Sequence, residues 1–422
     1  MGAILLIVLA TRSIPALSPP VDRDVLRAVL ARAGRWARTP GELSIAASDH
    51  YSRILGQWAP HPEEALCQAI ADVLDATGGS LAVPAWSRPG FREVLPRVFS
   101  NIHWMEPAED CLDPGASEVR EALAAGARAV LLAPIAGNCA ALPEIEALCA
   151  EAGALFAVDA RASVGSRMAD RGPESFGDLL LVPGDGEPGP SLLGGAVLFG
   201  SRTRIKLPPR QRTTLRRSLP LALRLLAHTV RYEPRLRSLW RGPRKDATVP
   251  RIDPDKVPRW AFAAAQAKLH QSNQRWSQRA RHVRTLHMHC SHLPGTTSLE
   301  DAPGAVTAGA AFPVLVPGAD LVRRNLARMG VKCVPGLAGW LAPKAMRGPM
   351  AEQIAEEAIF LPLHPFYRPE DMGFLTEALR RAVLRSGGGA PEAPAPALEP
   401  LESHEPEETG HPALRVVSNG AA

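Results

Sequence analysis

The feature that most constrains the fold is an alternation of apolar and helical patterns before and after residue 150. Residues 127–134 form an almost continuous apolar run, residues 142–151 repeat apolar side chains at helical spacing, and residues 154–159 form a second apolar run. Such runs are typical of strands buried on both faces, and a helix between them is typical of a crossover between parallel strands. The sequence therefore predicts an α/β fold with a mostly parallel sheet.

An aspartate, Asp159, ends the second apolar run. In open α/β sheets, ligands bind outside the carboxyl ends of the strands, so a polar residue at this position is a candidate for a functional site. The alternative is structural, because a carboxylate at a strand end can cap the helix that follows. We retain both interpretations of Asp159.

The sequence around Asp159 resembles that of the DegT-type nucleotide-sugar aminotransferases, which are fold-type I pyridoxal phosphate enzymes. The resemblance covers residues 13–385 and rests on the following stretches: IPALSPPV (14–21), LAVPAW (81–86), AVDARASVGSRMADRGPESFGDLLLV (157–182), LLGGAVLFG (192–200) and MAEQIAEEAIFLPLHP (350–365). The last stretch is the most specific. The resemblance implies a fold-type I transferase-like α/β fold, in which a large, mostly parallel sheet domain precedes a smaller α+β C-terminal domain.

The resemblance and the local patterns divide the chain into three parts. We expect residues 1–256 to form the large domain, residues 257–385 to form a linking helix and the small domain, and residues 386–422 to form a disordered acidic tail. The tail is rich in Gly, Pro, Ala and Glu, and it lacks the large apolar residues needed to build a core. Within the large domain, residues 202–244 form a basic amphipathic segment.

The patterns of the second part predict its elements. Residues 257–288 have the length and the Ala, Gln and Arg content of one long helix, which resembles the helix linking the two domains of the family. Residues 311–316 predict a strand, residues 319–329 an amphipathic helix ended by Gly330, and residues 369–384 a closing helix.

The resemblance also assigns cofactor roles. In the family, an aspartate pairs with the pyridine nitrogen of the cofactor and an aromatic side chain stacks on its ring. Asp159 matches the first position, while the second falls at Arg88 by strict register, with Trp86 two residues away as a substitute. The turn that receives the cofactor phosphate falls at Pro62 and Glu63. Proline lacks an N–H donor and glutamate repels a phosphate, so both residues weaken this helix start as an anion site.

The catalytic lysine of the family is missing. Its position falls at Glu187 or Pro188, and residues 1–205 contain no lysine. A lysine amine forms the Schiff base with pyridoxal phosphate, and neither glutamate nor proline can do so. Histidine, which replaces the lysine in some sugar dehydratases of the family, is absent between His103 and His228. We therefore expect no covalently bound cofactor, and pyridoxal phosphate stays only a candidate ligand.

Three functions are compatible with this departure. The first is a catalytically degenerate partner or regulatory subunit in nucleotide-sugar or surface-polysaccharide biosynthesis. The second is an enzyme with altered chemistry, in which Glu187 or Asp185 acts as a general base on a nucleotide sugar. The third is a conventional aminotransferase using another lysine, such as Lys206, Lys245 or Lys344. Because family members dimerise with active sites at the subunit interface, the first function implies a homodimer or a heterodimer with an intact aminotransferase.

The basic segment, residues 202–244, raises the question of an anionic partner. Its leucines share a predicted helix with Arg216, Arg217 and Arg224. This pattern is typical of a helix lying on an anionic membrane surface, and the alternative is a helix packed on the large domain with its arginines in solvent. Nucleic acid is not expected, because no groove of interleaved aromatic residues is apparent. The six cysteines lack close paired spacing and favour a cytoplasmic protein, with peripheral contact to the inner membrane surface as an option.

A cluster of histidines is a candidate metal site. The stretch HMHCSH contains His287, His289, Cys290 and His292. In a strand, His287 and His289 would lie on one face, from which a zinc site could be built. No distant CxxC or HExxH element completes the ligand set, so we expect no metal.

Overall fold

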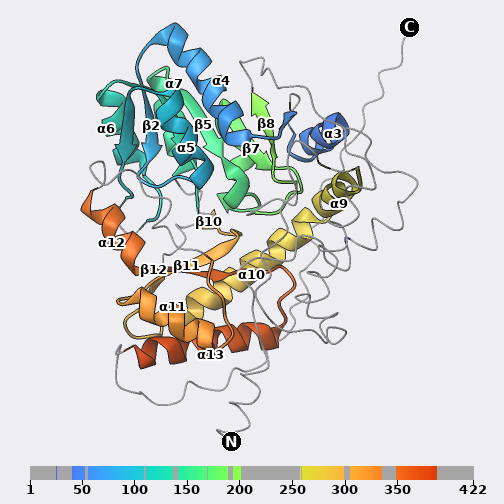
Figure 1. The fold of residues 1–422 in the computed structure, drawn as a ribbon, viewed down its shortest axis with the longest axis vertical. Helices are drawn as coiled ribbons and strands as arrows, with labels where there is room; N and C mark the ends of the chain where they lie inside the picture. Colours follow the sequence, from blue (N-terminus) through green and yellow to red (C-terminus); the bar gives the residue numbers. More distant parts are fainter. Residues whose placement is uncertain are drawn as a thin grey trace, which may run out of the picture. The chain divides into compact units, whose positions relative to one another are not determined.

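The computed structural model describes residue 25 and residues 40–52, 56–108, 111–135, 141–168, 170–188, 193–200, 257, 259–298, 305–334 and 348–386. A seven-stranded sheet lies at the centre of the first half (Figure 1). Its order is β1-β8-β7-β5-β4-β2-β3. The strands are β1 (Gly56–Ala59), β2 (Ser80–Pro84), β3 (Ile102–Met105), β4 (Ala127–Leu132), β5 (Leu155–Asp159), β7 (Leu179–Pro183) and β8 (Ala196–Gly200).

The directions of the strands confirm the predicted fold class. The pairs β3–β2, β2–β4, β4–β5 and β5–β7 are parallel, while β8 is antiparallel to both β7 and β1. The helices of the crossovers are α4 (Pro62–Thr77), α5 (Pro89–Val98), α6 (Ala116–Ala124) and α7 (Leu142–Glu151). The carboxyl ends of β2, β4, β5 and β7 therefore lie at one edge of the sheet, where a site is expected.

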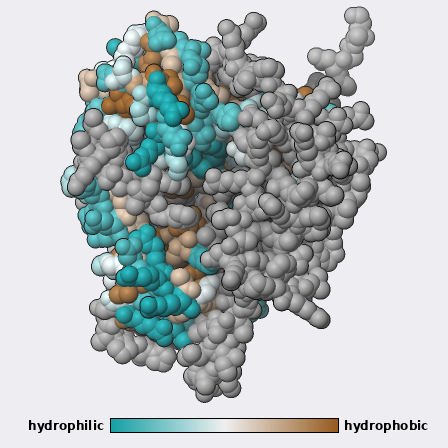
Figure 2. Space-filling model, in the orientation of Figure 1, coloured by the Kyte–Doolittle hydropathy of each residue, from teal (hydrophilic) through white to brown (hydrophobic). Residues whose placement is uncertain are grey.

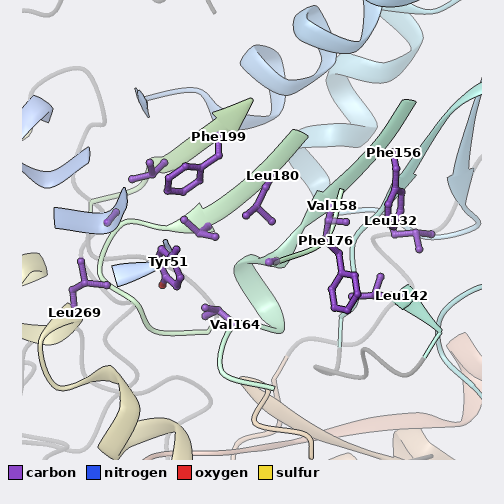
Figure 3. Packing of buried hydrophobic residues seen from close by; sticks show 14 of the residues in the cluster. Tyr51, Leu132, Leu142, Phe156, Val158, Val164, Phe176, Leu180, Phe199 and Leu269 are labelled. Carbon is purple, nitrogen blue, oxygen red and sulfur yellow. The ribbon is translucent and has the colours of Figure 1, made fainter. Parts of the chain in front are cut away.

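Both faces of this sheet are buried. Along β5, Phe156 and Val158 point into one core, and Leu155 and Ala157 point into the other. Helices α4 and α5 cover the second face, whereas α6, α7, α3 (Pro40–His50) and α9 (Arg259–Leu269) contribute to the core on the first. Figure 3 shows side chains of this first core projecting from neighbouring strands. Burial on two faces explains why the strands are apolar runs without alternation.

The crossover formed by residues 127–159 has the predicted form. α7 spans Leu142–Glu151, and Gly153 follows it with a φ of 64°, a left-handed conformation that glycine adopts without strain. β5 then begins at Leu155 and ends at Asp159. The sequence therefore places Asp159 correctly at the carboxyl end of a central strand.

A second core forms around a smaller antiparallel sheet. Its order is β12-β11-β9, with β9 at Thr297–Ser298, β11 at Ala311–Leu315 and β12 at Ala358–Pro362. The helices of this region are α10 (Ser272–Cys290), α11 (Ala319–Arg328), α12 (Pro349–Glu357) and α13 (Pro369–Arg385). The predicted strand and the two predicted helices thus lie within one residue of their observed ends. Two further short strands, β6 (Arg167–Met168) and β10 (Ala305–Val306), pair with each other.

The predicted single helix over residues 257–288 is wrong. The structure has two helices, α9 and α10, separated at His270 and Gln271. The hydroxyl of Ser272 donates to the carbonyl of Leu269 at 2.7 Å. The side chain of Ser272 thereby satisfies a carbonyl at the end of α9, at the point where the helical backbone ladder is interrupted. The composition of this region is helical throughout, so it gives no sign of the break.

The strand assumed for His287 and His289 is also wrong, because both residues lie in α10. Two residues apart on a helix, they are rotated by about 200° and do not share a face. The ring of His287 instead packs edge-on against Phe312, with centroids 4.8 Å apart. The described residues hold no group of three or more His, Cys, Asp or Glu side chains arranged for a metal ion.

Several predictions concern residues outside the described ones. They include the basic segment 202–244, the tail after Ser386, and Lys206, Lys245 and Lys344. The domain boundary after residue 256 likewise stays a prediction. No helix within the described ranges has the length and apolar character to cross a membrane.

The described surface is largely polar. On the face seen in Figure 2, hydrophilic side chains predominate and hydrophobic ones form small groups. Among the described residues, the large apolar side chains that are exposed are Ile45, Met288 and Leu321.

Candidate functional site

Asp159 is buried at the end of β5 and is held by Arg161. The Nε and Nη2 atoms of Arg161 each donate to a different carboxylate oxygen of Asp159, both at 2.8 Å, and the backbone N–H of Arg161 donates to Oδ1 at 3.1 Å. Arg88 lies at the start of α5, and its Nε is 3.3 Å from Oδ2. Asp159 caps the short 3-10 helix Ala160–Ala162, so the expected capping role is present together with an ion pair.

Arg161 reaches a second carboxylate. Its Nη1 lies 2.7 Å from Oε1 of Glu63, which stands in the first turn of α4. The guanidinium also lies over the ring of Phe91, 5.8 Å from its centroid. One arginine therefore bridges the end of β5 and the start of α4.

The charges around Asp159 keep it ionised. Burial alone would raise the pKa of the Asp159 carboxyl, but the charges of Arg161 and Arg88 and the hydrogen bonds from Arg161 outweigh burial, so its pKa lies below the ordinary value. Burial would likewise lower the pKa of Arg161, but Asp159 and Glu63 raise it above the ordinary value. Asp159 and Arg161 are therefore a stable ion pair at neutral pH.

Trp86 and Arg88 have separate environments. Arg88 is in contact with Asp159, as given above, whereas Trp86 is buried in an apolar cluster. That cluster joins the ends of the large sheet to α12 and β12 through residues such as Leu112, Ile354 and Phe360. The indole N–H of Trp86 has no hydrogen-bond partner within the described part of the chain.

Glu187, one of the two positions predicted for the family's lysine, lies in the loop after β7 and is buried. Its Oε1 accepts from Nη1 of Arg275 at 2.8 Å, and its Oε2 accepts from Nη2 of Arg279 at 2.7 Å. Both arginines belong to α10, four residues apart on one face. Pro188 is also buried.

The same loop is tied to α9 and α10 at two further points. Asp185 pairs with Nζ of Lys268 at 2.9 Å, and the indole of Trp276 donates to the carbonyl of Gly186 at 2.8 Å. Asp185 and Lys268 are both buried. The loop in which the resemblance predicts a lysine therefore presents two carboxylates, and each carboxylate is paired with a cation.

The environment of Glu187 disfavours a role as a general base. Burial would raise the pKa of Glu187, but Arg275, Arg279 and Lys268 lower it far below the ordinary value. A carboxylate with so low a pKa holds a proton weakly, and both of its oxygens are engaged.

The sequence analysis did not name Arg161, Lys268, Arg275 or Arg279. Two signals could have identified them. Arg161 follows Asp159 by two residues at a strand end, and Arg275 and Arg279 have the i, i+4 spacing that places two cations on one helix face. Lys268 is the one charged residue after Arg259 in the mostly apolar stretch RWAFAAAQAKL, which favours a buried cation.

The comparisons with known proteins agree with this fold. The model of the DegT/DnrJ/EryC1/StrS aminotransferase family matches residues 99–181, which include β4, α7 and β5. The chain has the fold of the DegT-type sugar aminotransferases. A DegT DnrJ EryC1 StrS aminotransferase from Brucella abortus is 15% identical, with a TM-score of 0.62, over 87% of this chain and 96% of that one.

Two further solved structures are similar. A putative sugar aminotransferase from Streptococcus pneumoniae in its PLP form is 13% identical, with a TM-score of 0.64, over 89% of this chain and 99% of that one. PseC from Helicobacter pylori, an aminotransferase involved in the biosynthesis of pseudoaminic acid, is 11% identical, with a TM-score of 0.65, over 89% of this chain and 100% of that one. No curated protein matches significantly.

The described residues do not fit pyridoxal phosphate. Both oxygens of Asp159 are engaged by arginine, so neither is free for a pyridine N–H. At the start of α4, Pro62 offers no N–H and Glu63 adds a negative charge where a phosphate would bind. In the loop after β7, where the resemblance predicts the lysine, Glu187 is a carboxylate, and the nearby amine of Lys268 is paired with Asp185.

Proposed function

We propose that this chain is a catalytically degenerate relative of the sugar aminotransferases that acts as a partner or regulatory subunit in nucleotide-sugar or surface-polysaccharide biosynthesis. The observation that carries the proposal is the pairing of Glu187 with Arg275 and Arg279 at the position of the catalytic lysine. A Schiff base requires a deprotonated amine, and a carboxylate fixed between two arginines cannot supply one.

The fold supports the partner role. In the family, the active sites lie at the subunit interface, so a chain without its own amine can complete the pocket of an intact aminotransferase. We expect the protein to form a homodimer or a heterodimer with such an enzyme and to act on the same nucleotide-sugar chemistry. Co-expression with an intact sugar aminotransferase of the same organism, followed by sedimentation velocity and assay of the partner's turnover, would contradict this role if neither association nor a change in turnover were found.

The absence of cofactor chemistry can be tested directly. The full chain is mixed with pyridoxal phosphate, reduced with borohydride and digested for mass spectrometry, with an intact sugar aminotransferase as the positive control. We expect no stoichiometric adduct on any single lysine. Lys268→Arg and Lys332→Arg serve as matched variants, because Lys268 lies beside the loop after β7 and Lys332 does not belong to this site.

One outcome would overturn the proposal. It is a stoichiometric adduct on one lysine, such as Lys268, that disappears in the corresponding Arg variant and accompanies amino transfer to a keto sugar. Sparse labelling spread over several lysines, unchanged in both variants, would support the proposal, because it is what surface amines give.

A further inference from the structure

We infer that Arg161 and Glu63 form an internal replacement for the cofactor, with the guanidinium in the role of the pyridinium and the carboxylate in the role of the phosphate. The inference deepens the proposed function and rests on it in one respect, the loss of the covalent cofactor. It adds that the vacated site is closed by the chain's own charges and takes no ligand of this class.

The first half of the replacement is the pairing with Asp159. A pyridinium would offer this carboxylate one N–H donor, whereas Arg161 offers two, through Nε and Nη2, both at 2.8 Å. The planar fork of arginine matches the two oxygens of a carboxylate. Asp159 thus keeps a cationic partner without a ligand.

The second half is the position of Glu63. It occupies the first turn of α4, where the helix dipole favours a negative charge. Its Oε1 lies 2.7 Å from Nη1 of Arg161, so the same guanidinium that binds Asp159 also binds Glu63. A single side chain therefore connects the two anchor points that a cofactor would connect.

The surrounding residues leave room for this arrangement. A Cβ atom at Gly90 would lie 2.8 Å from Cδ of Glu63, so a side chain at this position would displace the carboxylate. Phe91, the next residue of α5, lies beneath the guanidinium of Arg161. The start of α5 is thus shaped to hold Glu63 and Arg161 in place.

The charges of the group cancel. Arg88 and Arg161 carry two positive charges, and Glu63 and Asp159 carry two negative ones. The side chains of Asp159 and Arg161 are 0% and 8% exposed, and that of Glu63 is 20% exposed. An incoming phosphate or pyridinium would have to displace a partner from a buried ion pair, which leaves an uncompensated charge.

The experiment compares the full-length protein with four variants by thermal unfolding, without ligand and with pyridoxal phosphate or inorganic phosphate. Arg161→Gln should lower the Tm by about 3–6 °C, because Asp159 loses its main counter-charge. Asp159→Asn/Arg161→Gln should recover part of this loss, because the uncompensated charge is removed. Arg120→Gln, in an exposed pair with Glu144, is the control and should change the Tm little.

The measurements with added ligand test whether Arg161 and Glu63 replace the cofactor. We expect neither ligand to raise the Tm of the wild type, and pyridoxal phosphate to raise that of Glu63→Ser/Arg161→Ala, in which both anchor points are uncovered. A rise for the wild type with no lysine adduct would overturn this inference and leave the proposed function standing. A specific lysine adduct in the wild type would overturn the proposed function. An unchanged Tm in Arg161→Gln, no recovery in Asp159→Asn/Arg161→Gln, or no ligand effect in a folded Glu63→Ser/Arg161→Ala would also overturn the inference.

Discussion

Glu187 stabilises the fold at a position where the resemblance predicts a catalytic lysine. Its carboxylate accepts from Arg275 and Arg279, and the guanidinium of Arg279 also donates to the carbonyl of Leu363 at the end of β12. Glu187 thus joins the loop after β7 to the second core through α10. Its burial makes the pairing energetically important, since the loss of one partner leaves two buried cations.

Replacing Glu187 by alanine should therefore lower the free energy of unfolding by about 3–5 kcal/mol. The control is Glu144→Ala, which removes a carboxylate whose ion pair with Arg120 is largely exposed and should cost about 0–1 kcal/mol. Urea unfolding of both variants provides the measurement. Similar losses in the two variants would show that the buried pair has no special weight.

His282 provides a residue with a predictable pH dependence. Burial, and next the charges of Arg279 and Arg281, lower the pKa of His282 from the ordinary 6.5 to about 4. Below pH 6.5 the unfolded chain binds a proton at this residue and the folded chain does not, so stability is full above this pH and is lost as the pH falls towards 4. The contribution of His282 to the slope is at most about 1.4 kcal/mol per pH unit.

The pH dependence is tested by unfolding His282→Gln and the wild type between pH 7 and pH 4. The variant should lose stability less steeply over this interval. Gln274→Ala, which alters an exposed residue of α10 without an ionisable side chain, serves as the control and should follow the wild type. Parallel curves for His282→Gln and the wild type would refute the assignment.

At the scale of elements, the start of α12 is satisfied by a carboxylate from a distant part of the chain. Glu106 follows β3 and accepts from the backbone N–H groups of Gly348 at 2.7 Å and Ala351 at 3.0 Å, at the start of α12. A Cβ atom at Gly348 would lie 2.5 Å from Cδ of Glu106, so glycine permits this close approach. The large sheet thereby supplies the cap of a helix that packs on the smaller sheet.

Removing this cap should destabilise the protein. Glu106→Ala should lower the free energy of unfolding by about 1–3 kcal/mol, because two backbone donors lose their acceptor. Glu106→Gln should lose less, since its amide oxygen still accepts one bond. Glu93→Ala, at an exposed position of α5, should change stability by no more than about 0.5 kcal/mol. The cap would be unimportant if urea unfolding gave equal results for Glu106→Ala and Glu93→Ala.

At the scale of the whole molecule, we propose that the basic segment at residues 202–244 binds an anionic membrane surface. It lies outside the described residues, so the expectation rests on the sequence alone. Leucines and arginines on one predicted helix are typical of interfacial binding to anionic lipid.

The test is sedimentation with liposomes that contain anionic phospholipid. Replacing Arg216, Arg217 and Arg224 together by glutamate should abolish sedimentation of the full chain, because the attraction to the lipid becomes repulsion. Neutral phosphatidylcholine liposomes are the control and should not sediment the wild type. Equal sedimentation of the variant and the wild type would remove the membrane hypothesis.

The sequence alone determined the α/β class, the position of Asp159 and the lack of any lysine in residues 1–205. The reason is that apolar runs, helical spacing and residue identity are local properties. The tertiary structure decided what occupies the site, because Glu63, Asp159 and Arg161 come from different elements. In the second group, Glu187 comes from the loop after β7, Lys268 from α9, and Arg275 and Arg279 from α10. Whether a buried carboxylate is a cofactor ligand, a base or half of an ion pair depends on the charges that folding brings next to it.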